Sequence, residues 1–191
     1  MIRQIIFSSI CSLIGAIALV MSSAQSKQED VIKIQTINCI MAAFAFLILG
    51  GIVGFIIAMF EVVRNILLLT NKTTLKIYLI IIMLASAVSL YFNSNGLMGL
   101  LPICAFAILT FFFGLKDVPM RLLKIVMLFA NSLWIIYSIY VFAILGMIIG
   151  IVYSISIIVW LIKDGLFVKN KEKNKDIYHT DSIEQNNLRR L

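Results

Sequence analysis

The residues best suited to chemistry in this sequence stand inside apolar segments rather than between them. Glu61 and Arg64 lie one helical turn apart near the middle of one such segment, and Asn65 follows directly. A charge held at mid-depth in a membrane costs about 3 kcal/mol on insertion scales, so it should face protein or water and be paired. We therefore expect Glu61 and Arg64 to be partners, either as a structural ion pair or as part of a solute path.

Polar and aromatic side chains recur at a comparable depth in two later apolar segments. Asn131 and Trp134 lie on much the same face of one segment, and Tyr153 lies in the next. Taken singly, they are more simply interpreted as residues that bond or pack neighbouring helices. The shared depth of Glu61, Asn131 and Tyr153 favours a functional role, because transporters built from repeats bind their solutes near the midplane. The sequence thus predicts one candidate solute site, formed by Glu61, Arg64, Asn65, Asn131, Trp134 and Tyr153.

The remaining reactive side chains do not form a catalytic set. The only histidine, His179, lies in the polar C-terminal stretch, and every aspartate lies in a loop or in that stretch. Cys11, Cys39 and Cys104 stand singly in apolar segments, where small apolar fillers are their simplest role. No serine with a histidine base and no Cys/His metal cluster can be assembled. We expect a protein that is not an enzyme and that binds no cofactor and no metal.

Composition places the chain in a membrane. Apolar residues make up 62% of the 191 residues and charged residues 13%, far from the balance of a soluble domain. The apolar runs are about 20 residues long, which matches the hydrocarbon thickness crossed by a helix. They do not alternate apolar with polar residues, as strands of a membrane barrel would. The formal charge of +7 is better explained by membrane topology than by nucleic-acid binding.

The fold class predicted is all-α, a polytopic membrane protein with seven transmembrane helices. Short uncharged turns alternate with polar or charged connections along the chain. The predicted spans are 4–22, 34–49, 52–70, 76–92, 97–115, 122–142 and 145–163.

Basic residues gather on alternate connections and indicate the orientation. The connections on one side of the membrane carry eight basic residues near helix ends, whereas the opposite side has only Arg3. By the positive-inside rule, the side with the eight basic residues is cytoplasmic. The N-terminus is then outside and the C-terminus inside, which requires an odd number of spans. The basic residues counted on the cytoplasmic side are Lys27, Lys33, Lys72, Lys76, Lys116, Arg121, Lys124 and Lys163.

The first apolar segment has an alternative interpretation as a cleaved signal peptide. Arg3 precedes an apolar stretch, and Ser22, Ser23 and Ala24 resemble a small-residue cleavage site. Cleavage would leave six spans with every charged loop outside, against the positive-inside rule. A retained span is therefore favoured.

The sequence also predicts an internal repeat. Spans one to three and five to seven share the same order of helix, basic loop, helix, tight turn and helix, and a shift of 92 residues places Gly54 and Ala58 on Gly146 and Gly150. Small residues at this spacing allow close helix packing in lipid. An odd linker helix gives both units the same orientation, a 3+1+3 arrangement of two parallel three-helix bundles. The predicted boundaries are 1–72 for the first unit, 73–95 for the linker helix, 96–164 for the second unit and 165–191 for a basic, disordered cytoplasmic tail.

The partners expected follow from this topology. The lipid bilayer is the solvent, a small-molecule solute is the candidate ligand, and nucleic acid is not expected. The lysines of the tail, spaced by polar residues, favour a solvated topology anchor, with contact to anionic lipid as the alternative. A homo-oligomer is compatible with the sequence. The lysines concerned are Lys169, Lys171, Lys173 and Lys175.

Four short motifs of the sequence are characteristic. They are F-L-I-L-G at Phe46 to Gly50, A-M-F-E-V-V-R-N at Ala58 to Asn65, G-L-L-P at Gly99 to Pro102, and W-I-I-Y from Trp134. On these motifs the chain is similar, over roughly residues 8–165, to the bacterial inner-membrane family labelled YgjV, which implies a multi-pass protein of the bacterial inner membrane but no established activity.

The parallel-repeat architecture resembles that of SWEET sugar transporters. Gating in that family relies on prolines in several helices, whereas Pro102 and Pro119 are the only prolines of this sequence. The resemblance therefore favours a shared fold more than shared transport.

Two functions from different classes fit these observations. The first is a SWEET-like transporter or channel that moves a small solute by rocking of the two units around a midplane cavity. The second is a non-transporting scaffold or partner-binding subunit with the same fold. A cavity lined by Glu61, Arg64, Asn131 and Tyr153 would favour transport, whereas a close-packed centre would favour the scaffold.

Overall fold

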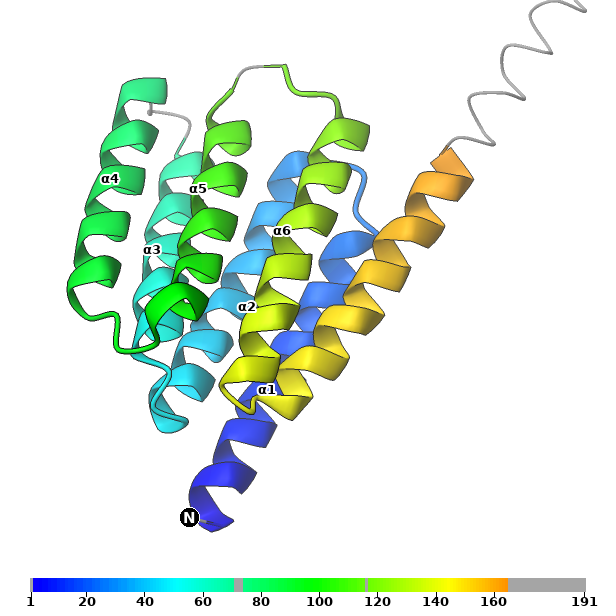
Figure 1. The fold of residues 1–191 in the computed structure, drawn as a ribbon. Helices are drawn as coiled ribbons and strands as arrows, with labels where there is room; N and C mark the ends of the chain where they lie inside the picture. Colours follow the sequence, from blue (N-terminus) through cyan, green and yellow to red (C-terminus); the bar gives the residue numbers. More distant parts are fainter. Residues whose placement is uncertain (1, 71–73, 116, 165–191) are drawn as a thin grey trace, which may run out of the picture. The chain divides into compact units, whose positions relative to one another are not determined.

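Every apolar segment of the chain forms a helix in the computed structural model, which describes residues 2–70, 74–115 and 117–164 (Figure 1). No strand occurs in these residues, so the predicted all-α class is confirmed. The predicted tail, 165–191, and the basic residues Lys72 and Lys116 lie outside this range. The helices are α1 (Ile2–Ser23), α2 (Gln28–Ile48), α3 (Ile52–Leu69), α4 (Leu75–Tyr91), the 3-10 helix η1 (Gly96–Gly99), α5 (Leu100–Gly114), α6 (Met120–Tyr140) and a final helix, Ile144–Asp164.

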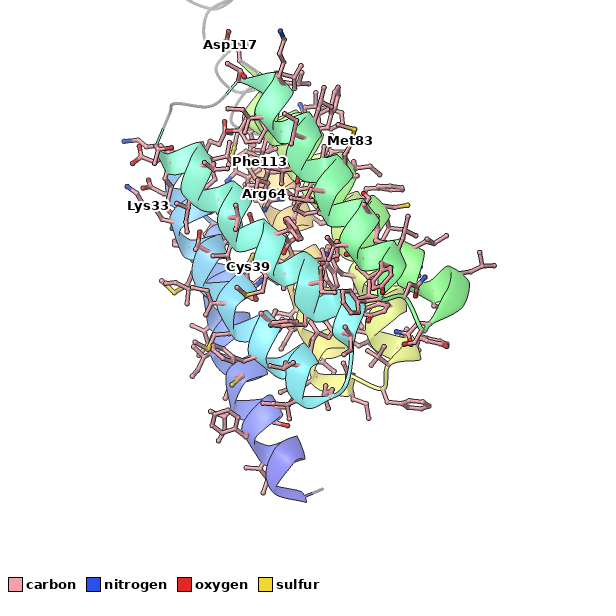
Figure 2. The ribbon with its side chains drawn as sticks, turned by 90° about the vertical axis from the view of Figure 1, so that its left-hand side faces the viewer. Lys33, Cys39, Arg64, Met83, Phe113 and Asp117 are labelled. Carbon is pink, nitrogen blue, oxygen red and sulfur yellow. The ribbon has the colours of Figure 1, made fainter. Side chains whose placement is uncertain are left out.

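Six of these helices are long and apolar enough to cross a membrane, and α4 is an apolar helix of 17 residues. At about 1.5 Å per residue, α4 falls somewhat short of a 30 Å hydrocarbon core unless neighbouring apolar residues extend it. Its outer face suits lipid, because Ile80, Met83 and Leu84 are all exposed. Figure 2 shows the Met83 side chain directed away from the other helices.

The start of α2 differs from the sequence prediction. The helix begins at Gln28, whereas the charged residues up to Lys33 were expected to form a loop. Glu29 and Asp30 stand in its first turn, where negative charge is favoured by the helix dipole. Lys33 Nζ also lies 2.5 Å from Glu29 Oε1, one turn away along the exposed face. These local interactions favour helix in residues that composition alone assigned to a connection.

The tight turns occur where the uncharged connections were expected. Gly50, between α2 and α3, and Gly96, after α4, both have positive φ, of 76° and 57°. Glycine adopts this conformation without the steric cost of a Cβ atom. Pro102 lies within the first turn of α5, where a missing backbone donor disrupts no helical hydrogen bond. Glycine thus allows the backbone of both turns, and in the second turn Asn95 Nδ2 also donates to Tyr137 Oη of α6 at 3.5 Å.

Residues 1–157 form one compact unit in which consecutive helices pack along each other. α2 lies between α1 and α3, while α4 contacts α3 and α5, and α5 contacts α6. One apolar cluster joins α3, α4 and α5 through Ile57, Ala85 and Phe106. A second cluster joins α2 and α6 through Phe46 and Tyr137. Helices from both halves of the sequence thus share buried surfaces.

The C-terminus of α1 is held by a buried lysine of α6. Lys124 Nζ donates hydrogen bonds to the carbonyl oxygens of Ser22 and Ser23, at 3.1 and 2.8 Å. The last carbonyls of a helix have no partner within it, and a cation there also interacts favourably with the helix dipole. In the sequence prediction Lys124 is only a marker of the basic side. The structure shows that it also holds the end of α1 against α6.

The expected alternation of connections is visible in space. The α1–α2 and α5–α6 connections lie at one end of this unit, with the end of α3 and the start of α4, and the α2–α3 and α4–α5 turns lie at the opposite end (Figure 1). Lys33 and Asp117 lie toward the same end in Figure 2. Charged connections and uncharged turns therefore occupy opposite ends.

Candidate functional site

A cavity of about 130 Å³ lies inside the unit formed by residues 1–157. An engineered cavity of about 150 Å³ is enough to bind benzene, so this space suits a solute of a few heavy atoms. Its wall comes from α1, α2, α3, α5, α6 and the first half of the final helix, and none of the described residues of α4 contributes. The polar and aromatic lining residues are Ser12, Gln35, Asn38, Cys39, Phe46, Glu61, Asn131, Trp134, Ser138 and Tyr153.

Glu61 is the one charged side chain on this wall among the described residues. It lies midway along α3 and is 9% exposed. The Sγ of Cys39, on α2, donates to Glu61 Oε2 at 3.2 Å, and no other donor in the described part of the chain reaches this carboxyl group. Because a thiol is a weak donor, this leaves much of the hydrogen-bonding capacity of Glu61 available to the cavity.

Arg64 faces away from the cavity and packs against α5. Its side chain is fully buried, with Nη1 donating to Thr110 Oγ1 at 3.3 Å. Nε and Nη2 donate to Asn65 Oδ1 at 3.0 and 2.8 Å. The guanidinium carbon lies 5.7 Å from the ring centre of Phe106 and 5.1 Å from that of Phe113. Figure 2 shows Arg64 and Phe113 close together between the helices.

The direct ion pair expected between Glu61 and Arg64 is not formed within the described residues. Residues three apart on a helix differ by about 60° around its axis, so one turn allows two side chains to face different neighbours. Glu61 points to the cavity and Cys39, whereas Arg64 has acceptors and aromatic rings on its own side. A weaker connection runs through Asn65, whose Nδ2 lies 3.9 Å from Cys39 Sγ. The two charges are thus linked through intervening side chains.

Asn131 and Trp134 both line the cavity, but each also contacts protein. Asn131 Nδ2 donates to Gly150 O at 2.7 Å and to Ser154 Oγ at 2.9 Å, which is the helix-bridging role considered for it. Trp134 stacks on Phe46, with ring centres 5.4 Å apart and planes inclined by 25°. Part of the predicted site is therefore also part of the helix packing.

Two buried polar atoms on the wall find no hydrogen-bond partner in the part of the chain that the structure describes. Tyr153 is 2% exposed, and its hydroxyl lies near the Ser22 side chain without meeting hydrogen-bond geometry in the described residues. Gln35, on α2, is 6% exposed, and its Oε1 likewise finds no partner there. A buried polar atom without a partner costs roughly 1–3 kcal/mol, which a polar ligand or water would offset.

The structure brings four of the six predicted residues to one cavity: Glu61, Asn131, Trp134 and Tyr153. Arg64 and Asn65 lie behind Glu61 and reach the wall only through Cys39.

The contribution of α2 to the site is not among the sequence predictions. Cys39 is expected to be an apolar filler, whereas its thiol donates to Glu61, and Gln35 and Phe46 line the cavity without having been predicted there. A signal was present, because Gln35, Asn38 and Cys39 recur at helical spacing and form a polar stripe on one face.

No group of three or more His, Cys, Asp or Glu side chains in the described part of the chain is arranged to hold a metal ion.

Comparison with known families decides the classification. The family model of the bacterial inner membrane protein Imp-YgjV matches residues 6–166, which is most of the chain. The chain belongs to this family. It is therefore an integral, multi-pass protein of the bacterial inner membrane, and the resemblance inferred from the four motifs is confirmed. No curated protein and no solved structure matches the chain.

Proposed function

We propose that this member of the Imp-YgjV family is a small transporter or channel that carries a small solute across the inner membrane. The observation that carries this proposal is which helices line the cavity. Its residues come from α1 to α3 and from α5 to the final helix, while α4 supplies none among the residues described. A cavity at the junction of two helix groups is where a rocking motion would open and close access, as in transporters built from repeats.

The proposal includes the 3+1+3 arrangement, with α4 as the linker, and an N-terminus outside the cell with a cytoplasmic C-terminus. Lys27 and Lys33 lie at or near the α1–α2 connection, Lys76 near the start of α4 and Arg121 near the start of α6. Figure 1 shows these parts of the helices at one end of the unit, which the proposal assigns to the cytoplasm by the positive-inside rule. Rigid-body movement of one three-helix group against the other would expose Glu61 to each side in turn.

The test is solute flux into proteoliposomes with a variant that fills the cavity. Ala130 is 2% exposed and lines the space, so Ala130→Leu should occupy it and reduce flux at least tenfold. Ala87→Leu, on the exposed face of α4, makes the same chemical change away from the cavity and should leave flux unchanged. Cationic, neutral and anionic solutes of a few heavy atoms should be compared, and equal flux in both variants would contradict a route through this cavity.

A scaffold remains the second candidate because of one observation. Arg64 is fully buried and its donors are directed to Asn65 and Thr110, as in a structural network. A scaffold predicts no flux of any tested solute above that of empty liposomes, while the purified protein is folded and thermally stable.

A further inference from the structure

The charge of the cavity wall is unbalanced. Glu61 contributes a carboxyl group, whereas no lysine, arginine or histidine of the described residues lines the space. The nearest cation on the same helix, Arg64, is turned toward Thr110 and the rings of Phe106 and Phe113. A solute in the cavity therefore meets the negative group directly, with the positive group behind it.

The wall also offers acceptors for the N–H donors of a solute. Gln35 Oε1 is buried without a partner among the described residues, and the carboxyl group of Glu61 accepts only from the Cys39 thiol there. Asn131 Nδ2 already donates to Gly150 O and Ser154 Oγ, whereas the Tyr153 hydroxyl has no hydrogen bond in the described part of the chain. The acceptors on the wall thus include a charged group, whereas the donors among the described lining residues are all neutral.

The rest of the wall suits a small organic ion. Phe46 and Trp134 line the cavity, and aromatic rings attract cations through their quadrupole. The volume of about 130 Å³ excludes large solutes.

From these three features we infer that the cavity binds a small organic cation with N–H donors, of the ammonium, amidinium or guanidinium class. Glu61 is the counter-ion, Gln35 accepts an N–H bond, and Phe46 with Trp134 forms the apolar wall. This inference rests on the proposed function, because it names the class of solute for the same site. Burying a carboxylate beside an anion would be unfavourable, and a neutral solute would leave the charge uncompensated.

Three planar probes of similar size separate these outcomes: guanidinium, urea and acetate, each at millimolar concentration. Calorimetric titration of the purified full-length protein should give saturable binding of guanidinium at least tenfold tighter than that of urea, and no saturable binding of acetate. Equal affinity for guanidinium and urea would overturn the inference, since shape rather than charge would then be recognised. Tighter binding of acetate would overturn it as well.

Substitutions test whether guanidinium binds in this cavity. Glu61→Gln keeps the shape and removes the charge, so it should abolish the preference for guanidinium over urea. Glu29→Gln removes an exposed carboxylate at the start of α2 and should leave that preference intact. Unchanged binding in Glu61→Gln would overturn the assignment. If that variant does not fold, Glu61→Asp decides, because it retains the charge and should still prefer guanidinium; equal affinity for the two probes would count against the site.

The inference and the proposed function can fail separately. Guanidinium binding without flux of any solute in proteoliposomes would remove the transport function and leave the cation site. Flux of neutral solutes that Ala130→Leu blocks, without guanidinium binding, would remove the cation site and leave transport.

Discussion

Arg64 is a fully buried cation with both polar and aromatic neighbours. Its planar guanidinium holds Asn65 and Thr110 at once and lies against two phenylalanine rings. A buried cation in lipid is tolerated only when such contacts compensate its lost hydration. Lysine could not reproduce them, because an ammonium is a point charge without the planar fork.

Arg64→Lys should therefore destabilise the protein by about 2 kcal/mol or more, through lost charged hydrogen bonds. Arg121→Lys makes the same change at an exposed position near the start of α6 and should be close to neutral. Thermal unfolding in detergent micelles measures both. Equal melting temperatures for the two variants would mean that the Arg64 contacts contribute little to stability.

Only part of this residue-scale network could be predicted from the sequence. An ionisable pair inside an apolar segment marks Glu61 and Arg64 as special, and both are indeed buried. Their choice of partner depends on Cys39 from α2 and on Thr110 from α5, which are separated from them by many residues. A single sequence does not reveal which distant side chains face a given helix.

At the scale of elements, the small residues of the motif in α3 and the final helix are not all packed equally tightly. A Cβ atom added to Gly54 would lie 2.9 Å from Phe46 Cγ, and one added to Gly150 would lie 2.5 Å from Ile135 Cγ1. At Gly146 the nearest atom, Ser138 Oγ, would be 3.4 Å away. The sequence motif treats Gly146 and Gly150 alike, whereas only the latter is in close contact.

We expect Gly54→Ala and Gly150→Ala to lower stability by about 1–3 kcal/mol, because the added methyl group overpacks the helix contacts. Gly146→Ala is the matched control and should be neutral or stabilising by up to about 1 kcal/mol, since alanine favours helix. Melting temperatures of the three variants in one detergent give the comparison. A loss at Gly146 as large as at Gly150 would refute this account of the packing.

Helix identity was predictable because the apolar runs are long and most are bounded by glycine or by polar residues, although the turn at Val141, Phe142 and Ala143 has neither. The start of α2 could not be predicted, because charged residues are common both in loops and in the solvated first turn of a helix. The Glu29–Lys33 pair and the acidic first turn decide for helix.

At the scale of the whole molecule, the proposed transport requires that the cavity open to each side of the membrane. The cavity wall combines residues from helices early and late in the chain, including Glu61 on α3, Asn131 on α6 and Tyr153 on the final helix. In the proposed orientation, the end of the bundle with the basic connections faces the cytoplasm and the end with the uncharged turns faces outward.

Access to the cavity from both sides is the most direct measurement. In a protein whose three cysteines are replaced by serine, Ala42→Cys places a thiol on the cavity wall. Membrane-impermeant thiol reagents are then applied to either side of proteoliposomes. Lys27→Cys should react only from the cytoplasmic side and Asn95→Cys only from the outer side, while Leu84→Cys on the exposed face of α4 should react from neither. The account predicts that Ala42→Cys reacts from both sides, and labelling from one side only, or from neither, would contradict it.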